Sequence, residues 1–161
     1  MNKSFRRVVT AHDKHGKSVI RSNELLTPAP IAIGVADFQL VWTTPTVPAD
    51  NTDETDGAAV DAGLTLKGGS VVRIVDMLPG KASPMHRSFS IDYGLVIAGE
   101  LELELDGGEI VPLKAGDIVV QRGTNHLWRN PSADTTCRIA FVLIEAAPVV
   151  IDGRPLAEIH P

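Results

Sequence analysis

The sequence predicts an all-β domain, and three observations support this. Residues 100–105 alternate glutamate with leucine, which is the period-two pattern of a strand with one apolar and one acidic face. The 161 residues include 14 Gly and 11 Pro, so turns are frequent. No long stretch repeats apolar residues with the 3.6-residue period of a helix. Many short strands separated by turns are typical of a sandwich or a barrel.

The first 41 residues are expected to contribute N-terminal strands. Arg6–Thr10 and Ser18–Arg21 have the composition of short strands, and the polar turn 12–17 lies between them. Leading strands of this kind commonly cover a sheet edge, because an uncovered edge pairs with other chains. We therefore expect them to pair with an edge of the main sheet or with a partner subunit.

Residues 42–67 are expected to form an acidic loop. Between Trp42 and Leu66 there is no Lys or Arg, and the acidic residues are Asp50, Asp53, Glu54, Asp56 and Asp61. One interpretation is a solvated surface loop. The other is a mobile lid over the mouth of the barrel, since long loops in compact domains are often functional.

Residues 68–147 carry the main run of strands, and 148–161 form a C-terminal tail. A tight turn at 106–108 joins the Glu/Leu strand to a return strand, so these two form a hairpin. The breakers 79–80, 122–124 and 130–132 separate the other elements. The remaining strands are predicted at Ser70–Met77, Asp92–Ile97, Ile118–Val120, Leu127–Asn130 and Thr136–Glu145.

Composition excludes several classes of protein. The net charge of −5 and the pI near 5.5 argue against a nucleic-acid partner, which needs a basic face. No apolar run approaches the roughly 20 residues that cross a membrane, and the N-terminus lacks the apolar core of a secretion signal. Cys137 is the only cysteine and lies in an apolar strand, so we expect an inert buried thiol in a cytoplasmic protein.

The segment from Gly80 to Glu100 resembles the first motif of the cupin superfamily. His86 takes the first histidine position and Asp92 takes the carboxylate position, six residues before Gly99. The second histidine of the motif is absent, and Ser88 stands in its place.

The segment 116–130 resembles the second cupin motif. It keeps the glycine at Gly116, the late histidine at His126 and the asparagine at Asn130. It lacks the usual proline and is one residue shorter than the family pattern. The resemblance covers residues 68–145, and is closest to small uncharacterised, RmlC-like cupins that carry His-Arg-Ser-x-Ser-x-Asp-Tyr-Gly and Val-Gln-Arg-Gly-Thr-Asn-His.

The resemblance implies a double-stranded β-helix, or jelly-roll barrel, with His86, Asp92 and His126 as metal ligands. The residues agree with this, because His86, Ser88, Ser90 and Asp92 share one face of an extended strand. Two imidazoles and a carboxylate suit Fe, Mn, Ni or Zn and leave coordination positions open.

The same residues also allow a site that has lost its metal. With Ser88 in place of a histidine, His86 and Asp92 would hydrogen-bond each other or the backbone. The barrel would then bind an organic ligand directly.

Other side chains are candidates for the wall or the chemistry of the pocket. Ser88, Ser90 and Trp128 are predicted to line it. Tyr93 and Arg122 are catalytic candidates: Tyr93 as a proton donor beside Asp92, and Arg122 as a partner for an anionic substrate. Their alternative roles are a barrel-wall aromatic and a structural ion pair.

Two functions follow. The first is a metal-dependent enzyme that acts on a small, oxygen-rich organic molecule, as an oxygenase, decarboxylase, isomerase or lyase. The alternative is a metal-free cupin that binds a small organic ligand without catalysis. In either case the early strands favour a homodimer.

Overall fold

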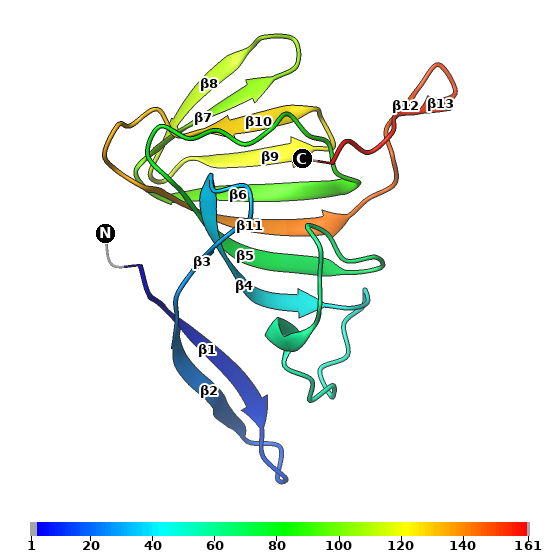
Figure 1. Ribbon diagram of the computed structural model, residues 1–161. Coiled ribbons are helices and arrows are strands. Elements are labelled where there is room, and N and C mark those ends of the chain that lie inside the picture. Colours follow the sequence, from blue (N-terminus) through cyan, green and yellow to red (C-terminus); the bar gives the residue numbers. More distant parts are fainter. Residues whose placement is uncertain (1–2, 161) are drawn as a thin grey trace.

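The computed structural model describes residues 3–160, and it confirms the all-β prediction. Two antiparallel sheets face each other (Figure 1). In spatial order the larger sheet contains β3 (Ala29–Pro30), β4 (Ala36–Thr44), β5 (Ser70–Met77), β11 (Cys137–Glu145), β6 (Ser90–Ala98) and β9 (Ile118–Arg122). The smaller sheet contains β10 (His126–Arg129), β7 (Glu100–Leu105) and β8 (Ile110–Lys114).

The sequence predicted that the barrel begins at residue 68. In the structure its larger sheet begins earlier in the chain, with β3 and β4. Strand β4 pairs with β5 from Ala36 opposite Met77 to Thr44 opposite Ser70. The register shifts between Leu40 and Trp42, so the strand loses the regular alternation that would have marked it in the sequence. The acidic loop accordingly starts after Thr44.

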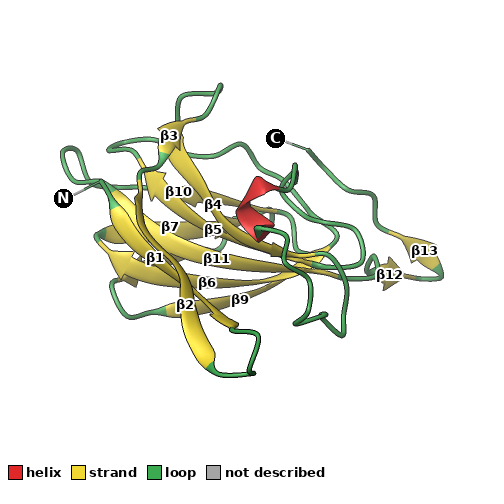
Figure 2. Cartoon of the chain, turned by 90° about the horizontal axis from the view of Figure 1, so that it is seen from below, coloured by secondary structure: helices red, strands yellow, loops and turns green. Residues whose placement is uncertain are grey.

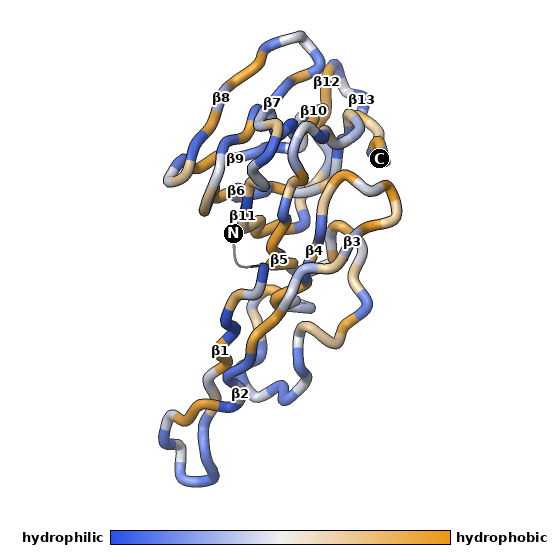
Figure 3. The backbone as a smooth tube through the Cα atoms, turned by 60° about the vertical axis from the view of Figure 1, so that its left-hand side comes forward, coloured by the Kyte–Doolittle hydropathy of each residue, from blue (hydrophilic) through white to orange (hydrophobic). Residues whose placement is uncertain are grey.

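The N-terminal strands β1 (Phe5–His12) and β2 (Ser18–Leu26) form a separate hairpin. It makes its own two-stranded sheet and, within this chain, extends neither barrel sheet. Figures 1 and 3 both show it projecting away from the barrel. Pairing with a partner subunit stays a prediction.

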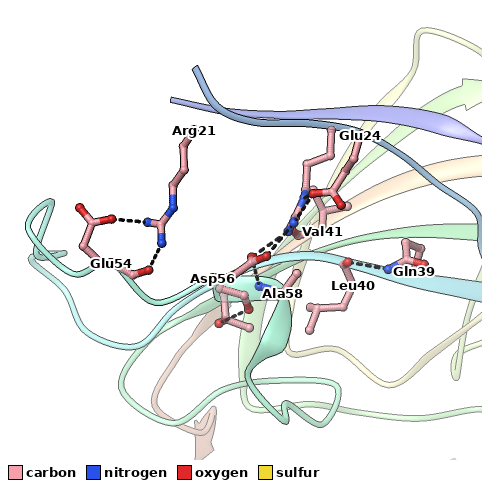
Figure 4. A network of polar contacts seen from close by, with 11 residues as sticks. Arg21, Glu24, Gln39, Leu40, Val41, Glu54, Asp56 and Ala58 are labelled. Carbon is pink, nitrogen blue, oxygen red and sulfur yellow. Dashed lines mark hydrogen bonds and ion pairs between the residues drawn. The ribbon is translucent and has the colours of Figure 1, made fainter. Parts of the chain in front are cut away.

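The acidic loop is tied to this hairpin by ion pairs (Figure 4). The guanidinium of Arg7 lies 2.8 Å from the Asp56 carboxylate and also pairs with Glu24. Arg21 lies 3.1 Å from Glu54. Asp56 also caps the short helical turn η1 (Gly57–Ala59), the only helix among the described residues (Figure 2). Two acidic residues of the loop thus have cationic partners.

The core lies between the two sheets. Fully or almost fully buried side chains of β5, β7 and β11, such as Val75, Leu101 and Ile139, pack together there. Cys137 is completely buried among them, and burial raises the pKa of its thiol to about 12. A thiol in this state is un-ionised at neutral pH, as expected of an inert core cysteine.

The C-terminal tail folds back along the barrel. Strands β12 (Val150–Ile151) and β13 (Arg154–Pro155) form a small hairpin. Beyond it, Ile159 exchanges two backbone hydrogen bonds with Arg87. No helix in residues 3–160 is long and apolar enough to cross a membrane.

Candidate functional site

A cavity of about 280 Å³ lies between the two sheets, at the inner faces of β4, β5, β6, β10 and β11. Most of its wall is apolar, and the polar side chains are few. The polar lining is Arg73, Ser83, His86, Ser88, Asp92 and His126. The apolar lining includes Ile31, Ile33, Phe38, Leu64, Val75, Met77, Trp128, Phe141 and Leu143. A concave apolar site with a few polar groups is the usual form of a small-molecule site.

Two histidines lie side by side in this wall. His86 and His126 exchange backbone hydrogen bonds of 2.8 and 2.9 Å, so the extended segment around His86 joins the edge of the smaller sheet beside β10. Residues directly opposite in such a pair bring their side chains together. The two imidazole centroids are 4.3 Å apart. The edge of the His126 ring also packs against Trp128, at 5.6 Å between centroids.

The backbone fixes the same tautomer in both rings. Nδ1 of His86 lies 2.9 Å from the Pro84 carbonyl oxygen, and Nδ1 of His126 lies 2.9 Å from that of Thr124. Because a carbonyl oxygen only accepts, each neutral ring carries its proton on Nδ1 and keeps a lone pair on Nε2. Burial, with the neighbouring His86, lowers the pKa of His126 to about 4, so this ring is neutral at neutral pH.

Asp92 supplies a carboxylate to the cavity wall. Its side chain is buried in β6, and its Oδ1 has no hydrogen-bond partner among the described residues. Burial raises the pKa of Asp92 to about 6, against the opposing effects of the Ser90 hydroxyl and the Arg73 charge. A buried carboxylate oxygen without a partner is costly and therefore uncommon.

The predicted metal ligands His86, Asp92 and His126 come from two different sheets. In the described part of the chain, no three His, Cys, Asp or Glu side chains lie close enough to hold one metal ion. The histidines belong to the smaller sheet and its edge, whereas Asp92 belongs to β6 in the larger sheet. The described side chains thus form a pair of imidazoles and a separate carboxylate, and metal binding by all three stays a prediction.

Arg73 is a cavity residue that the sequence analysis missed. It lies on β5, is 9% exposed, and lines the cavity. Its Nη2 donates to the carbonyl oxygens of Gly63 and Leu64, and its guanidinium lies 5.6 Å from the Phe38 ring centroid. Its buried Nε has no partner among residues 3–160. The signal was available: in residues 70–77, Arg73 shares the parity of buried apolar residues, where a cation is unexpected.

The predicted pocket serines are joined to each other. The hydroxyl oxygens of Ser88 and Ser90 are 2.8 Å apart, and both residues are buried. Ser88 lines the main cavity, whereas both serines line a second cavity of about 120 Å³. Arg122, a catalytic candidate, lines this second cavity together with Arg87.

Tyr93 lies on the opposite side of the wall from Asp92. Neighbouring residues of a strand point to opposite faces, so the residue after the inward Asp92 points outward. Tyr93 is 40% exposed and lines neither cavity. Trp128, in contrast, lines the main cavity as predicted for a pocket wall.

A glycine shapes one wall of the cavity. A Cβ at Gly94 would lie 2.9 Å from Cε1 of Phe141, closer than side chains normally approach. Phe141 lines the cavity and packs against Trp128, with 5.3 Å between the ring centroids. The absence of a side chain at Gly94 therefore allows this aromatic wall to lie flat on β6.

Comparison with known proteins supports the architecture. The family model of the cupin domain matches residues 73–144. The chain is 46% identical over 157 residues to phomopsin biosynthesis cluster protein C′ of Diaporthe leptostromiformis. The alignment covers 93% of this chain and 83% of the relative. It is 35% identical over 156 residues to the cupin-domain-containing oxidoreductase fogC of Aspergillus ruber. This alignment covers 93% of this chain and 77% of the relative.

Solved structures agree on the fold. The crystal structure of an uncharacterized conserved protein with a double-stranded β-helix domain from Klebsiella pneumoniae superimposes with a TM-score of 0.54 at 20% identity, covering 83% of this chain and 91% of that one. KdgF from Halomonas sp. superimposes with a TM-score of 0.51 at 19% identity, covering 73% and 86%. With two facing sheets, a cavity between them and relatives that carry the same domain, this chain belongs to the cupin superfamily.

Proposed function

We propose that the chain is a cupin enzyme that acts on a small, mostly apolar organic molecule with one polar end. The observation that carries the proposal is the unpartnered Oδ1 of Asp92, which lies in the wall of an apolar cavity that also contains His86 and His126. From the sequence we expected an oxygen-rich substrate. The apolar lining instead favours a hydrocarbon body with its polar group at this end of the cavity.

Proton transfer is the chemistry that these side chains support best. The ionised Asp92 carboxylate takes a proton from a substrate group at Oδ1, and the protonated carboxyl returns it later in the reaction. A pKa of about 6 places this group near neutral pH, where both forms are accessible. The Nε2 atoms of the two imidazoles accept hydrogen bonds and orient the substrate.

The relatives favour an enzyme in a biosynthetic setting. Those of Aspergillus ruber, Hypocrea virens and Neurospora crassa are named cupin-domain-containing oxidoreductases, at 35%, 35% and 31% identity. Others are named as members of the phomopsin and oryzines biosynthesis clusters. By analogy, we propose that the substrate of this chain is a biosynthetic intermediate.

The experiment begins with the natural substrate. A strain in which the gene is deleted should accumulate the substrate, and purified protein should convert this compound in vitro. Asp92→Asn should lower the rate at least about 100-fold, the loss expected when a general acid–base group is removed. Asp106→Asn is the matched control, because it makes the same chemical change in an exposed turn. An unchanged rate in Asp92→Asn would refute the proposal.

Binding of a divalent metal is a separate proposal. The free Nε2 lone pairs of His86 and His126 support it, because a hydrogen bond from Nδ1 to a carbonyl is the usual support of a ligating imidazole. A bound Fe, Mn, Ni or Zn ion would supply a Lewis acid. Elemental analysis after expression, followed by titration of dialysed protein, should find one metal per chain that His126→Gln loses. No binding of any of the four metals would contradict it.

One observation favours the alternative function, a metal-free binding protein: Ser88 stands in place of the second motif histidine, and its hydroxyl is hydrogen-bonded to that of Ser90. A binding protein would hold the accumulated compound and release it unchanged. Product analysis by mass spectrometry in the same assay therefore separates the two functions.

The homodimer also remains a proposal. Five apolar side chains are exposed on the outer face of the paired strands β6 and β9, and such a patch commonly marks an interface. They are Tyr93, Leu95, Ile97, Ile118 and Val120. Light scattering at micromolar concentration should give twice the mass of the 17.2 kDa chain, and a monomeric mass would contradict the proposal.

A further inference from the structure

Two unpartnered polar atoms of opposite character belong to side chains that line the same cavity. Nε of Arg73 is a hydrogen-bond donor, and Oδ1 of Asp92 is an acceptor. Both atoms are fully buried, and neither has a partner among the described residues. The two side chains lie near enough for each charge to stabilise the charged form of the other, so we treat the two atoms as a donor–acceptor pair.

The two side chains do not satisfy each other. No hydrogen bond or salt bridge joins them in the described part of the chain, although the charge of each stabilises the charged form of the other. Arg73 is only 9% exposed and Asp92 only 5%, so bulk water compensates neither. Burial of a charge without a direct partner is unfavourable, so a ligand that hydrogen-bonds to these groups would recover part of that cost on binding.

Arg73 is held in place as a recognition group would be. Its Nη2 donates to the carbonyl oxygens of Gly63 and Leu64, and its guanidinium lies over the ring of Phe38. These contacts use the end of the side chain and leave Nε free. A donor fixed in this way loses little conformational entropy when a ligand binds.

We propose that this pair recognises a ligand whose polar end is a carbonyl group with an adjacent N–H, as in a primary amide. The carbonyl oxygen accepts from Arg73 Nε, and the N–H donates to Asp92 Oδ1. This inference rests on the proposed function, because it assigns the substrate class of the same cavity.

Other ligand classes fit the pair less well. A monovalent anion or cation is attracted by one member of the pair and repelled by the other, so it gains little electrostatic energy in return for losing its hydration. A purely apolar molecule removes water from the cavity and leaves both atoms unpaired, which costs binding free energy.

Three nearly isosteric probes test the inference. Benzamide carries both the carbonyl and the N–H, acetophenone carries the carbonyl alone, and α-methylstyrene carries neither. NMR titration of the full-length protein should show affinity falling about tenfold at each step of this series, since each step leaves one more charged group without a partner.

Variants assign each step to one side chain. Arg73→Met should reduce the preference for acetophenone over α-methylstyrene to less than about twofold, and Asp92→Ala should do the same for benzamide over acetophenone. If either variant does not fold, Arg73→Gln or Asp92→Asn replaces it, with the corresponding preference expected to fall at least threefold.

The outcomes separate this inference from the proposed function. Equal binding of all three probes would overturn the donor–acceptor inference and leave the apolar cavity of the proposed function intact. Preferences that persist in the variants would overturn the assignment to Arg73 and Asp92. No binding of any probe at millimolar concentration would overturn both proposals.

Discussion

Two buried arginines lie on neighbouring strands of the larger sheet, and they have opposite surroundings. Arg138 on β11 forms two 2.6 Å contacts with the carboxylate of Asp76 on β5, which is 2% exposed. Arg73, also on β5, has no carboxylate within ion-pair distance among the described residues. One guanidinium is neutralised within the fold, and the other is left with a free donor.

Strand parity explains the difference. Asp76 and Arg73 are three positions apart on β5 and therefore point to opposite faces of the sheet. Arg138 and Asp76 lie on the outer face beneath the N-terminal segment, where Arg138 also contacts the Phe5 ring. Arg73 points into the cavity. The outer pair serves stability, and the inner arginine is positioned for a ligand.

The largest change in the free energy of unfolding is expected when the ion pair of Arg138 and Asp76 is broken. Asp76→Asn should lower the free energy of unfolding by about 3–5 kcal/mol, because it leaves the buried Arg138 charge uncompensated. Urea denaturation measures this. The double variant Asp76→Leu with Arg138→Met should recover most of the loss. A change below about 1 kcal/mol in the single variant would show that the pair is not structural.

The next largest changes in the free energy of unfolding should come from the titration of Asp92 and His126 with pH. Asp92 has a raised pKa of about 6, so its contribution to stability is present at low pH and is lost as pH rises from about 4 to 6. His126 has a lowered pKa of about 4, so its contribution is present above about pH 6.5 and is lost as pH falls toward 4. Each contribution amounts to at most about 3 kcal/mol, and the two nearly cancel in the wild type.

Single variants should reveal how each group alone changes the free energy of unfolding with pH. In metal-free buffer, His126→Gln should lose stability as pH rises from 4 to 6, whereas Asp92→Asn should gain stability over the same range. Urea denaturation at several pH values measures both. Parallel profiles for the wild type and the two variants would contradict the assigned shifts.

A smaller effect is expected at the cavity wall. Gly94→Ala places a methyl group against the Phe141 ring and should cost about 1–3 kcal/mol of stability, as overpacking usually does. Because Phe141 lines the cavity, affinity for α-methylstyrene should fall as well. Gly107→Ala is the matched control, since a Cβ there meets no atom within 4 Å. Equal stability of the two variants would mean that Phe141 moves aside freely.

The smallest effect on stability is expected at the inner arginine. Arg73→Met removes a buried charge that lacks a direct ion-pair partner, which favours folding, and two hydrogen bonds to the Gly63 and Leu64 carbonyls, which opposes it. Because these effects offset each other, the free energy of unfolding should change by about 1 kcal/mol or less. The preference for acetophenone over α-methylstyrene should nevertheless fall below about twofold. A loss of stability as large as that of Asp76→Asn would show that Arg73, like Arg138, is a structural residue.

The sequence predicted those features that depend on alternation and turns. The Glu/Leu hairpin and the inert Cys137 follow from local patterns. It did not predict that β4 belongs to the barrel, because a register shift interrupts its alternation. Nor did it predict the separation of Asp92 from the histidine pair, which depends on how two sheets approach each other in space.

The most direct test of the central claim is a crystal structure of the protein with benzamide. Our account predicts the phenyl ring within the apolar cavity, the carbonyl oxygen within hydrogen-bond distance of Arg73 Nε, and the amide nitrogen within hydrogen-bond distance of Asp92 Oδ1. Benzamide bound only at the outer surface, or Arg73 and Asp92 paired directly with each other around a closed cavity, would contradict it.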